Sequence, residues 1–330
     1  MPVHQSLSPS SIRNLRASLL GWYAVSRRDL PWRRTQDPYR VWVSEMMLQQ
    51  TRVAAVLDYY KHFLERFPDV VSLAKAAEAD VLAAWSGLGY YRRARAMHAT
   101  ARQIVDEFEG EFPRTPEALE SLPGIGRYTA AAISSIAFGA HTAVVDGNVE
   151  RVLSRVLGKH LRDRSEAWVH AETLLAPGRS GDWNQAMMEL GATVCLPREP
   201  KCLVCPIRKW CKDPGRAVKK RQPPRQRKEF SYGLARRKTS VYLIQRPMSD
   251  SLMPGMWELP GVEAENGQEV LHSARHSITN KDYAISVFAL EACEVAGGKW
   301  VRCNKLRDLP VTGLARKILR AANLWPTAGI

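Results

Sequence analysis

Several features that would assign a chain to a specialised class are scarce or absent here. The 330 residues include only six cysteines, and no internal repeat or low-complexity segment is visible. No apolar run approaches the ~20 residues that a bilayer-spanning helix needs. The first residues, 1–16, lack an apolar stretch followed by a small-residue cleavage site, so no secretory signal is expected. These absences predict a cytoplasmic or otherwise intracellular protein that does not enter a membrane.

Acidic residues are also few relative to basic ones. The chain has 33 Asp and Glu against 48 Lys and Arg, a formal net charge of +15. Such an excess favours a polyanionic partner, and nucleic acid comes first because no amphipathic membrane anchor is visible. Charge alone leaves open a soluble protein that simply has a basic surface.

The few cysteines are concentrated in one place. Four of the six fall within 17 residues, spaced C-x6-C-x2-C-x5-C, at Cys195, Cys202, Cys205 and Cys211. Four soft ligands on one short stretch suit an iron–sulfur cluster or a structural zinc. Zinc sites usually have two C-x2-C knuckles, whereas this stretch has one knuckle with unequal arms. The spacing favours [4Fe–4S] and leaves zinc and disulfides as alternatives.

The distribution of residue types predicts a multidomain protein. Apolar residues recur at helical spacing as far as about residue 212, with proline-led helix starts at Asp37–Pro38 and Thr115–Pro116. Residues 213–230 are basic and proline-containing, which indicates a linker along phosphates or a solvated tether. In 231–330, stretches 240–245, 283–293 and 299–303 read as strands, and 313–322 as a helix capped by Thr312. We therefore expect a mostly α domain followed by a smaller α+β domain.

The segment LPGIGRYTA at 122–130 joins two helical patterns through a Gly-x-Gly turn. Gly124 and Gly126 would let main chain approach a ligand, and the next helix would present free N–H groups suited to a phosphate. This predicts a helix–hairpin–helix element at about 116–137. A purely structural corner remains the alternative.

Two carboxylates stand out as catalytic candidates. Glu45 shares a helix face with Val41, Trp42 and Leu48, so desolvation would raise the pKa of its carboxyl toward that of a general acid. The alternative is a glutamate that reaches solvent at the edge of that face. Asp146 follows an extended apolar run and precedes a helix, where it would be an N-cap or a rigid stabiliser of developing positive charge.

The segment GLGYYRR at 87–93 places aromatic rings beside cations. This is suited to entering a base stack, although an aromatic core cluster would look the same. The eight histidines show no metal-ligand spacing, and only His276 draws interest.

Taken together, these motifs resemble one known family. LPWR at 30–33, SEMMLQQT at 44–51, GLGYY at 87–91, LPGIG at 122–126, VDGNV at 145–149 and the cysteine run occur in the order found in helix–hairpin–helix DNA glycosylases. The match spans residues 12–212 and is similar to the MutY-type adenine DNA glycosylases, which remove adenine mispaired with 8-oxoguanine. A weaker resemblance over 232–330, through YLIQRP at 242–247 and GMWELP at 255–260, is to their Nudix-like recognition domain.

The resemblance implies a role for each matching residue. Glu45 would protonate N7 of an extruded adenine and later help to activate water, while Asp146 would stabilise the oxocarbenium sugar or bond to it. Tyr128 and Asn148 would orient these groups. The residues implied to contact substrate are Arg28, Trp32, Arg33 and Glu189 around adenine, Gln50 and Tyr90 as wedges in the duplex, Thr51 and Leu88 near the oxidised guanine, and Gly124 and Gly126 at the hairpin. The implied cofactor is a [4Fe–4S] cluster on the four cysteines, in the loop 195–211.

Tyr128 also separates two branches of this superfamily. It stands where the endonuclease III-type glycosylase/lyases have a lysine, and a neutral phenol cannot form a Schiff base. The resemblance therefore implies a monofunctional hydrolase that acts as a monomer on duplex DNA with 8-oxoguanine:adenine or guanine:adenine mispairs. A glycosylase/lyase and a non-catalytic iron–sulfur DNA-binding protein are the alternatives.

Three positions depart from the family pattern. No acidic Nudix helix follows Gly261, so nucleotide hydrolysis is not expected there. The recognition turn Phe-Ser-His is replaced by residues 278–280 after His276; here Thr279 keeps a hydroxyl but the turn has no histidine, which puts lesion discrimination in doubt. Glu150 replaces a lysine of some members, so Schiff-base trapping should be weak.

Overall fold

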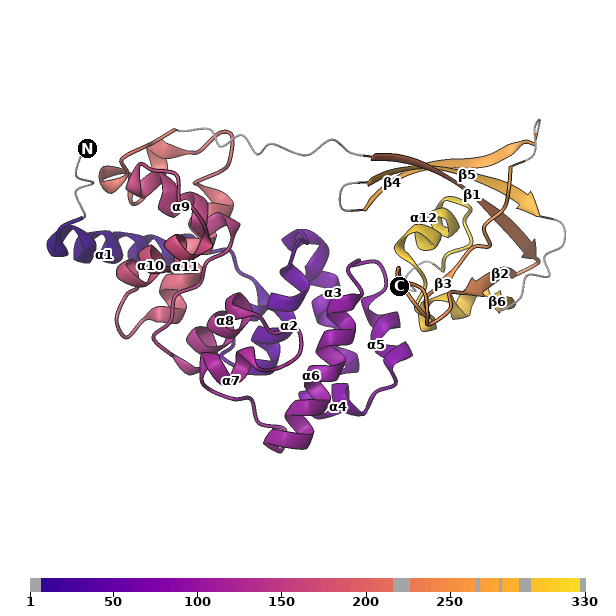
Figure 1. The fold of residues 1–330 in the computed structure, drawn as a ribbon, viewed down its shortest axis with the longest axis horizontal. Helices are drawn as coiled ribbons and strands as arrows, with labels where there is room; N and C mark the ends of the chain where they lie inside the picture. Colours follow the sequence, from indigo (N-terminus) through magenta and orange to yellow (C-terminus); the bar gives the residue numbers. More distant parts are fainter. Residues whose placement is uncertain (1–6, 216–225, 265–267, 279–280, 291–297, 327–330) are drawn as a thin grey trace. The chain divides into compact units, whose positions relative to one another are not determined.

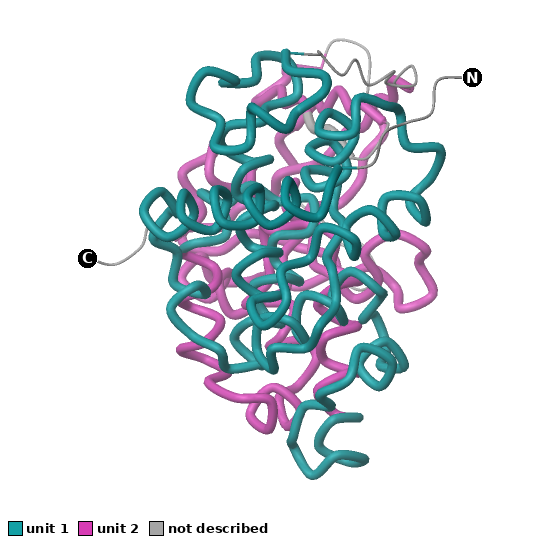
Figure 2. Tube along the Cα trace, turned by 90° about the vertical axis from the view of Figure 1, so that its left-hand side faces the viewer, with its two compact units in different colours: residues 1–57, 103–220 teal, residues 58–102, 221–330 magenta. Residues whose placement is uncertain are grey.

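A computed structural model describes residues 7–215, 226–264, 268–278, 281–290 and 298–326. The chain forms two compact units, residues 1–57 with 103–220 and residues 58–102 with 221–330, shown in teal and magenta in Figure 2. Among the described residues, no helix combines the length and the apolar character needed to cross a bilayer.

The first unit is helical. Its helices are α1 (Pro9–Ser26), α2 (Pro38–Leu48), α7 (Pro116–Glu120), α8 (Arg127–Phe138), α9 (Gly147–Leu157), α10 (Arg164–Leu174) and α11 (Ser180–Thr193), with short 3-10 turns η1 (Pro31–Arg33), η2 (Cys202–Val204) and η3 (Arg208–Trp210). The side chains of Asp37 and Thr115 accept hydrogen bonds from Arg40 N and Ala118 N, and a proline follows each cap. The two predicted helix starts are confirmed.

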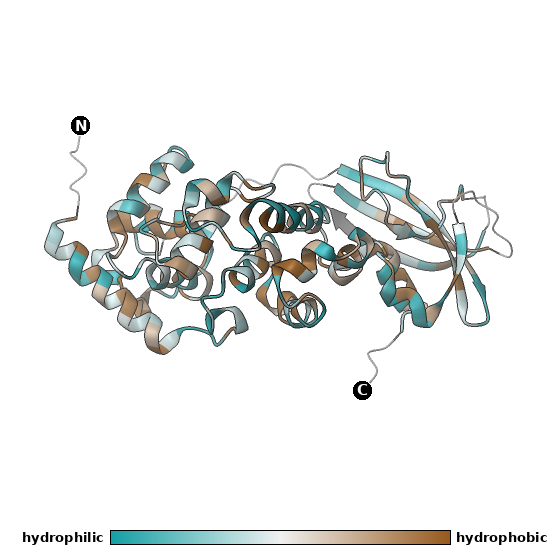
Figure 3. Cartoon of the chain, turned by 90° about the horizontal axis from the view of Figure 1, so that it is seen from below, coloured by the Kyte–Doolittle hydropathy of each residue, from teal (hydrophilic) through white to brown (hydrophobic). Residues whose placement is uncertain are grey.

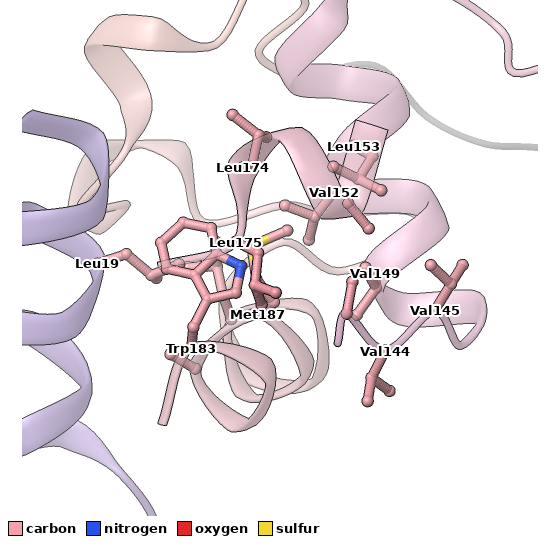
Figure 4. Packing of buried hydrophobic residues seen from close by; sticks show 14 of the residues in the cluster. Leu19, Val144, Val145, Val149, Val152, Leu153, Leu174, Leu175, Trp183 and Met187 are labelled. Atoms are coloured by element: carbon pink, nitrogen blue, oxygen red, sulfur yellow. The ribbon is translucent and has the colours of Figure 1, made fainter. Parts of the chain in front are cut away.

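The core of this unit lies between α1, α9, α10 and α11. Leu19 of α1 points toward Trp183 of α11, and Val149, Val152 and Leu153 of α9 face the same interior (Figure 4). Trp183 is 2% exposed, so nearly all of the apolar surface of its indole ring is removed from water. The hydropathy colouring shows brown, hydrophobic stretches mixed with hydrophilic ones along the helices (Figure 3), and in α9 the buried residues Val149, Val152, Leu153 and Val156 recur at helical spacing. This packing fixes α9 and α11 against each other.

The predicted hairpin is present. The tight turn at 122–126 joins α7 to α8, and Ile125 N donates to Leu122 O across it at 3.2 Å. Gly126 is the N-cap of α8 and offers no side chain to close the helix end, so the first N–H groups of α8 remain available. Helix α8 packs on α2, which carries Glu45.

The second unit contains α4 (Val70–Lys75), α5 (Glu78–Trp85), α6 (Arg92–Phe108) as far as residue 102, and most of α3 (Val53–Arg66). Its other part is a sheet domain. The strands are β1 (Gln226–Arg237), β2 (Ser240–Gln245), β3 (Trp257–Glu258), β4 (Val270–Ile278), β5 (Lys281–Leu290) and β6 (Gly298–Arg302), followed by η4 (Cys303–Asp308) and α12 (Gly313–Ala321). The sheet order is β3-β2-β1-β5-β4, with β6 on β2.

The long strand β1 connects the two halves of this sheet. It pairs in parallel with β5 over ten residue pairs beginning at Gln226–Lys281, and antiparallel with β2 at Arg236–Val241. Helix α12, drawn in yellow in Figure 1, lies against β3 and β4. Its apolar residues join Val241, Leu243 and Trp257 in one core.

The coarse prediction, a helical domain followed by a domain with strands, is confirmed. Strand β2 and the Thr312-capped helix α12 lie where the sequence placed them. Three strands were not predicted, β1, β3 and β4. Strand β1 begins at Gln226, inside the range expected to be a linker. Its first five residues are exposed and, apart from Phe230, polar or charged, so their sequence does not indicate a strand.

Candidate active site

A pocket of about 500 Å³ opens in the first unit. Its walls come from η1, the end of α2, the start of α8, the N-terminus of α9 and the middle of α11. The predicted site residues that line it are Arg28, Trp32, Arg33, Glu45, Gln50, Thr51, Tyr128, Asp146, Asn148 and Glu189. Four stretches of the chain, 28–51, 128, 146–148 and 189, therefore bring the predicted residues into one cavity.

Glu45 is buried in this pocket. Glu45 is 6% exposed, and the Tyr128 hydroxyl donates a hydrogen bond to its Oε2 at 2.7 Å. Burial raises the pKa of the Glu45 carboxyl from 4.5 to about 7, and Asp146 adds to the rise, while Tyr128 and Arg33 oppose it. The expected apolar environment is confirmed, and the alternative of a solvent-directed glutamate is wrong. Glu45 can carry a proton at neutral pH and release it.

Asp146 is held rigidly at the start of α9. Its Oδ1 accepts hydrogen bonds from Asn148 N at 2.8 Å and Val149 N at 2.7 Å, which makes it the predicted N-cap. Asn148 Nδ2 donates to Oδ2 at 2.8 Å. Helix N–H groups favour a negative charge at this point. The carboxylate is fixed at the pocket wall with its charge stabilised.

The support of Asn148 depends on close contact between α9 and α11. Arg151 Nη2 donates to Asn148 Oδ1 at 2.9 Å and to Gly191 O at 2.8 Å. A β-carbon at Gly191 would lie 2.6 Å from the β-carbon of Asn148, so only glycine permits this approach. Arg151 and Gly191 were not predicted, since nothing in the sequence pairs them with Asn148.

Glu189 is the opposite kind of carboxylate. Its side chain is 0% exposed and accepts from Arg28 Nε at 2.8 Å, Arg28 Nη2 at 2.6 Å and Arg33 Nη2 at 2.8 Å. Burial opposes ionisation, but the hydrogen bonds from the two arginines outweigh it and lower the pKa of Glu189 to about 2. Glu189 is therefore an ionised anchor for two guanidinium groups, whereas the Glu45 carboxyl, with a pKa of about 7, can hold a proton at neutral pH.

The rim of the pocket is formed by residues that follow α2. Gln50 has φ of +57°, a left-handed conformation that is strained for a residue with a side chain. Thr51 Oγ1 donates to Gln49 O at 3.3 Å. Leu48 and Gln49 also line the pocket, as does Met188, whose sulfur lies 3.4 Å from the Tyr128 hydroxyl. Met188 adjoins Glu189 in the sequence, which was the one signal for it.

The remaining predicted residues lie elsewhere. Leu88 and Tyr90 belong to the second unit, where Leu88 is buried and Tyr90 is 43% exposed. Gly124 and Gly126 form the hairpin turn. His276 is in β4, opposite Tyr283 of β5. Thr279 lies outside the described residues.

The model of the HhH-GPD superfamily of base excision DNA repair proteins matches residues 43–175. The chain is 34% identical over 416 residues to the adenine DNA glycosylase of Rattus norvegicus, across 97% of this chain and 80% of the rat protein. The chain belongs to the adenine DNA glycosylase family. The resemblance read from its motifs is confirmed.

One more curated relative and one solved structure also match this chain. The adenine DNA glycosylase of Mus musculus is 38% identical over 338 residues, which cover 83% of this chain and 65% of the mouse protein. The chain thus spans just under two thirds of that relative's length. A solved structure of a thermostable thymine-DNA glycosylase matches with a TM-score of 0.58 and 30% identity, over 63% of this chain and 98% of that one.

In this member of the adenine DNA glycosylase family the four clustered cysteines line one small cavity. None of them is in a disulfide, and burial together with the neighbouring thiols raises the pKa of Cys205 to about 11. Over the part of the chain that the structure describes, no group of three or more His, Cys, Asp or Glu side chains could hold a single metal ion. The thiols surround a space rather than meet at a point.

Helix α9 connects this cysteine loop to the pocket. Arg155, 2% exposed, donates from Nη1 to Cys195 Sγ at 3.1 Å and to Leu196 O at 2.8 Å, and from Nη2 to Pro197 O at 3.0 Å. Asp146 caps the other end of the same helix. The cysteine loop and the Asp146 carboxylate are therefore both hydrogen-bonded to α9.

Proposed function

We propose that this protein is a monofunctional adenine DNA glycosylase that excises adenine opposite 8-oxoguanine or guanine in duplex DNA. The observation that carries the proposal is the pairing in one pocket of a buried, protonatable Glu45 with a charge-stabilised Asp146. Two carboxyls with different environments are what hydrolysis of a glycosidic bond requires. Membership of the adenine DNA glycosylase family supports adenine as the base, and the motif resemblance supports the mispair.

The adenine would enter the pocket after extrusion from the duplex, because its glycosidic bond cannot be reached inside the stack. Glu45 gives its proton to N7 of the base, which turns adenine into a neutral leaving group as the bond to C1′ breaks. A buried acid with a pKa of about 7 is matched to this step at neutral pH. The ionised carboxylate that remains can then accept a proton from the attacking water.

Asp146 would stabilise the positive charge that develops on the sugar. Its oxygens already accept bonds from α9 and from Asn148, so the carboxylate need not reorganise during the reaction. The guanidinium groups of Arg28 and Arg33, fixed by Glu189, face the space that the base would occupy. Their donors would contact acceptor atoms of adenine.

The absence of a lyase step is proposed from Tyr128. Its hydroxyl is committed to Glu45, and burial raises the pKa of this phenol well above 10. It cannot attack C1′ as an amine would. The strand should therefore remain intact after base removal.

The cysteine loop is proposed to hold a [4Fe–4S] cluster. Cys195, Cys202, Cys205 and Cys211 all face one cavity and none is in a disulfide, a donor set that fits a four-thiolate cluster. When bound, the cluster would cross-link the loop through its four thiolates and would take no part in the reaction. Arg208 and Lys209 on the same loop would then be presented to DNA phosphates.

The C-terminal domain is proposed to be Nudix-like and to recognise the lesion opposite the adenine. His276 lies in β4, and in the sequence Thr279 follows the last residue of this strand, at the position that the resemblance matches to the family's recognition turn. The net charge of +15 supports a DNA partner. We further propose that the protein acts as a monomer inside the cell.

A single-turnover assay tests the function. Duplexes with 8-oxoguanine:adenine, guanine:adenine or an oxidised pyrimidine are mixed with excess protein, and each sample is split before treatment with alkali. We expect adenine release with strand breaks only after alkali, and a loss of at least about 100-fold in Glu45→Gln. Glu120→Gln, an exposed glutamate of α7, serves as the control.

The alternatives give different results. Strand scission of the pyrimidine duplex without alkali would assign a glycosylase/lyase. Unchanged rates in both Glu45→Gln and Asp146→Asn would remove the proposed chemistry from this pocket.

A further inference from the structure

The segment 86–91, between α5 and α6 of the second unit, is an irregular turn, here called the 86–91 turn. Gly87 and Gly89 have φ of +102° and +73°, and Tyr90 has φ of +52°. Glycine adopts this region without strain, so the conformational cost falls on Tyr90, whose left-handed backbone persists only if its surroundings hold it. The Tyr90 ring at its tip is 43% exposed.

One side of the turn is held by its own helices. Arg93 Nη2 donates to Gly89 O at 3.3 Å, and Trp85 Nε1 donates to the same oxygen at 3.1 Å. The Arg93 guanidinium lies 5.4 Å from the Trp85 ring and 5.2 Å from the Tyr90 ring. Burial lowers the pKa of Arg93 to about 10, so this cation contacts Tyr90 in a desolvated setting, where such contacts are strongest.

The other side of the turn is held by the C-terminal domain. Ser86 Oγ donates to Val311 O at 2.6 Å. Arg316 of α12 donates from Nη1 to Ser86 O and, at 2.5 Å, to the Tyr59 hydroxyl, which itself donates to Ser86 O at 2.8 Å. These residues all belong to the second compact unit.

The contact reaches the backbone of the turn. A β-carbon at Gly87 would collide with the Tyr59 hydroxyl and the Arg316 guanidinium, so the C-terminal domain covers the peptide directly. In the described parts of the chain Arg316 forms no salt bridge, and its buried Nε has no hydrogen-bond partner. The half-buried Arg316 guanidinium faces neutral partners, the acceptors at Ser86 and Tyr59 and the rings of Tyr59 and Trp325, and these contacts offset its desolvation cost.

We propose that Arg316 is a positioning residue for base extrusion. Together with the Val311 carbonyl, it holds the 86–91 turn in the conformation that projects Tyr90 toward the duplex. The C-terminal domain thereby acts on the wedge as well as on the opposite base. This inference rests on the proposed glycosylase function and deepens it.

The test uses the full-length protein. Arg316→Ala removes both hydrogen bonds that Nη1 donates, to Ser86 O and to the Tyr59 hydroxyl, whereas Arg316→Lys keeps a cationic donor. The control, Arg320→Ala, removes an exposed cation from the next turn of the same helix. Adenine excision is measured under single-turnover conditions. A fluorescent base analogue beside the adenine reports unstacking independently of bond cleavage.

We expect Arg316→Ala to slow both unstacking and excision about tenfold, which corresponds to about 1.4 kcal/mol. Arg316→Lys should recover part of the loss, and Arg320→Ala should match the wild type. When the pairs flanking the adenine are mismatched and the base is already unstacked, the Arg316→Ala defect should largely disappear. The same defect on that duplex would overturn the proposal.

A double-mutant cycle separates positioning from general stability. If Arg316 acts through Tyr90, Arg316→Ala should add nothing in a Tyr90→Ala background, whereas additive losses would contradict the proposal. Ser86→Ala removes the Val311 contact without altering the guanidinium, and provides a second variant if Arg316→Ala does not fold. Wild-type unstacking without adenine release would refute the function but leave the positioning role standing.

Discussion

The buried carboxyl of Glu45 should make the protein less stable at neutral pH, and Glu45→Gln should remove that cost. In the folded protein the pKa is about 7, against an ordinary value of 4.5 that applies to the unfolded chain. The folded state therefore binds the proton more tightly, and stability falls as pH rises from about 4.5 to about 7. Above pH 7 the cost is constant.

The magnitude follows from the same two values. One pKa unit corresponds to about 1.4 kcal/mol, so the change from 4.5 to about 7 amounts to roughly 3 kcal/mol. Glutamine has the same shape and its amide oxygen can still accept the Tyr128 hydrogen bond. Glu45→Gln should therefore be inactive but about 3 kcal/mol more stable at pH 8, and less than about 1 kcal/mol more stable at pH 5.

Urea unfolding followed by far-ultraviolet circular dichroism at the two pH values measures this difference. Glu120→Gln, exposed on α7, should change stability by less than about 0.5 kcal/mol at both. A Glu45→Gln protein no more stable than the wild type at pH 8 would refute the reasoning. So would an equal gain at pH 5 and pH 8, because a pH-independent gain cannot come from the proton.

Three further outcomes are expected. Tyr128→Phe removes the hydroxyl that favours ionised Glu45, so the upper pH limit of excision should rise by about one unit in a pH–rate profile. Glu189→Gln should cost about 3 kcal/mol in urea unfolding and raise KM, because two arginines lose their anionic partner; an unchanged KM would separate Glu189 from the base pocket. Arg155→Met should lower iron per chain and visible absorbance, and full iron with a normal excision rate would show that α9 does not support the loop.

Local chemistry explains why some features could be predicted from the sequence. The caps at Asp37, Thr115 and Thr312 depend on residues within three positions, so their side chains and the following turn determine them. The burial of Glu45 followed from apolar neighbours at helical spacing. Family motifs supplied the rest of the pocket.

Features that depend on distant residues could not be predicted. Arg28 and Glu189 are 161 positions apart, and only the fold shows that their contact leaves Glu189 ionised. Strand β1 is rich in lysine and arginine, and it becomes a strand because β5 and β2 pair with it. The contact of Arg316 with Ser86 spans 230 positions.

Residues 58–102 form one compact unit with the C-terminal domain, so the two should stay together even when the chain between them is cut. A protease cut between residues 215 and 226 would break the chain but not the contacts of Ser86, Tyr59 and Arg95 with Val311, Arg316 and Pro254. The two fragments should therefore stay bound to each other after cleavage and elute together in size-exclusion chromatography under native conditions. Conversely, a polypeptide that ends at residue 212 would present the bare 86–91 turn and the surface around it to water. The C-terminal domain is thus better regarded as a cover for the 86–91 turn and the surface around Tyr59 and Arg95 than as an appendage attached by a tether.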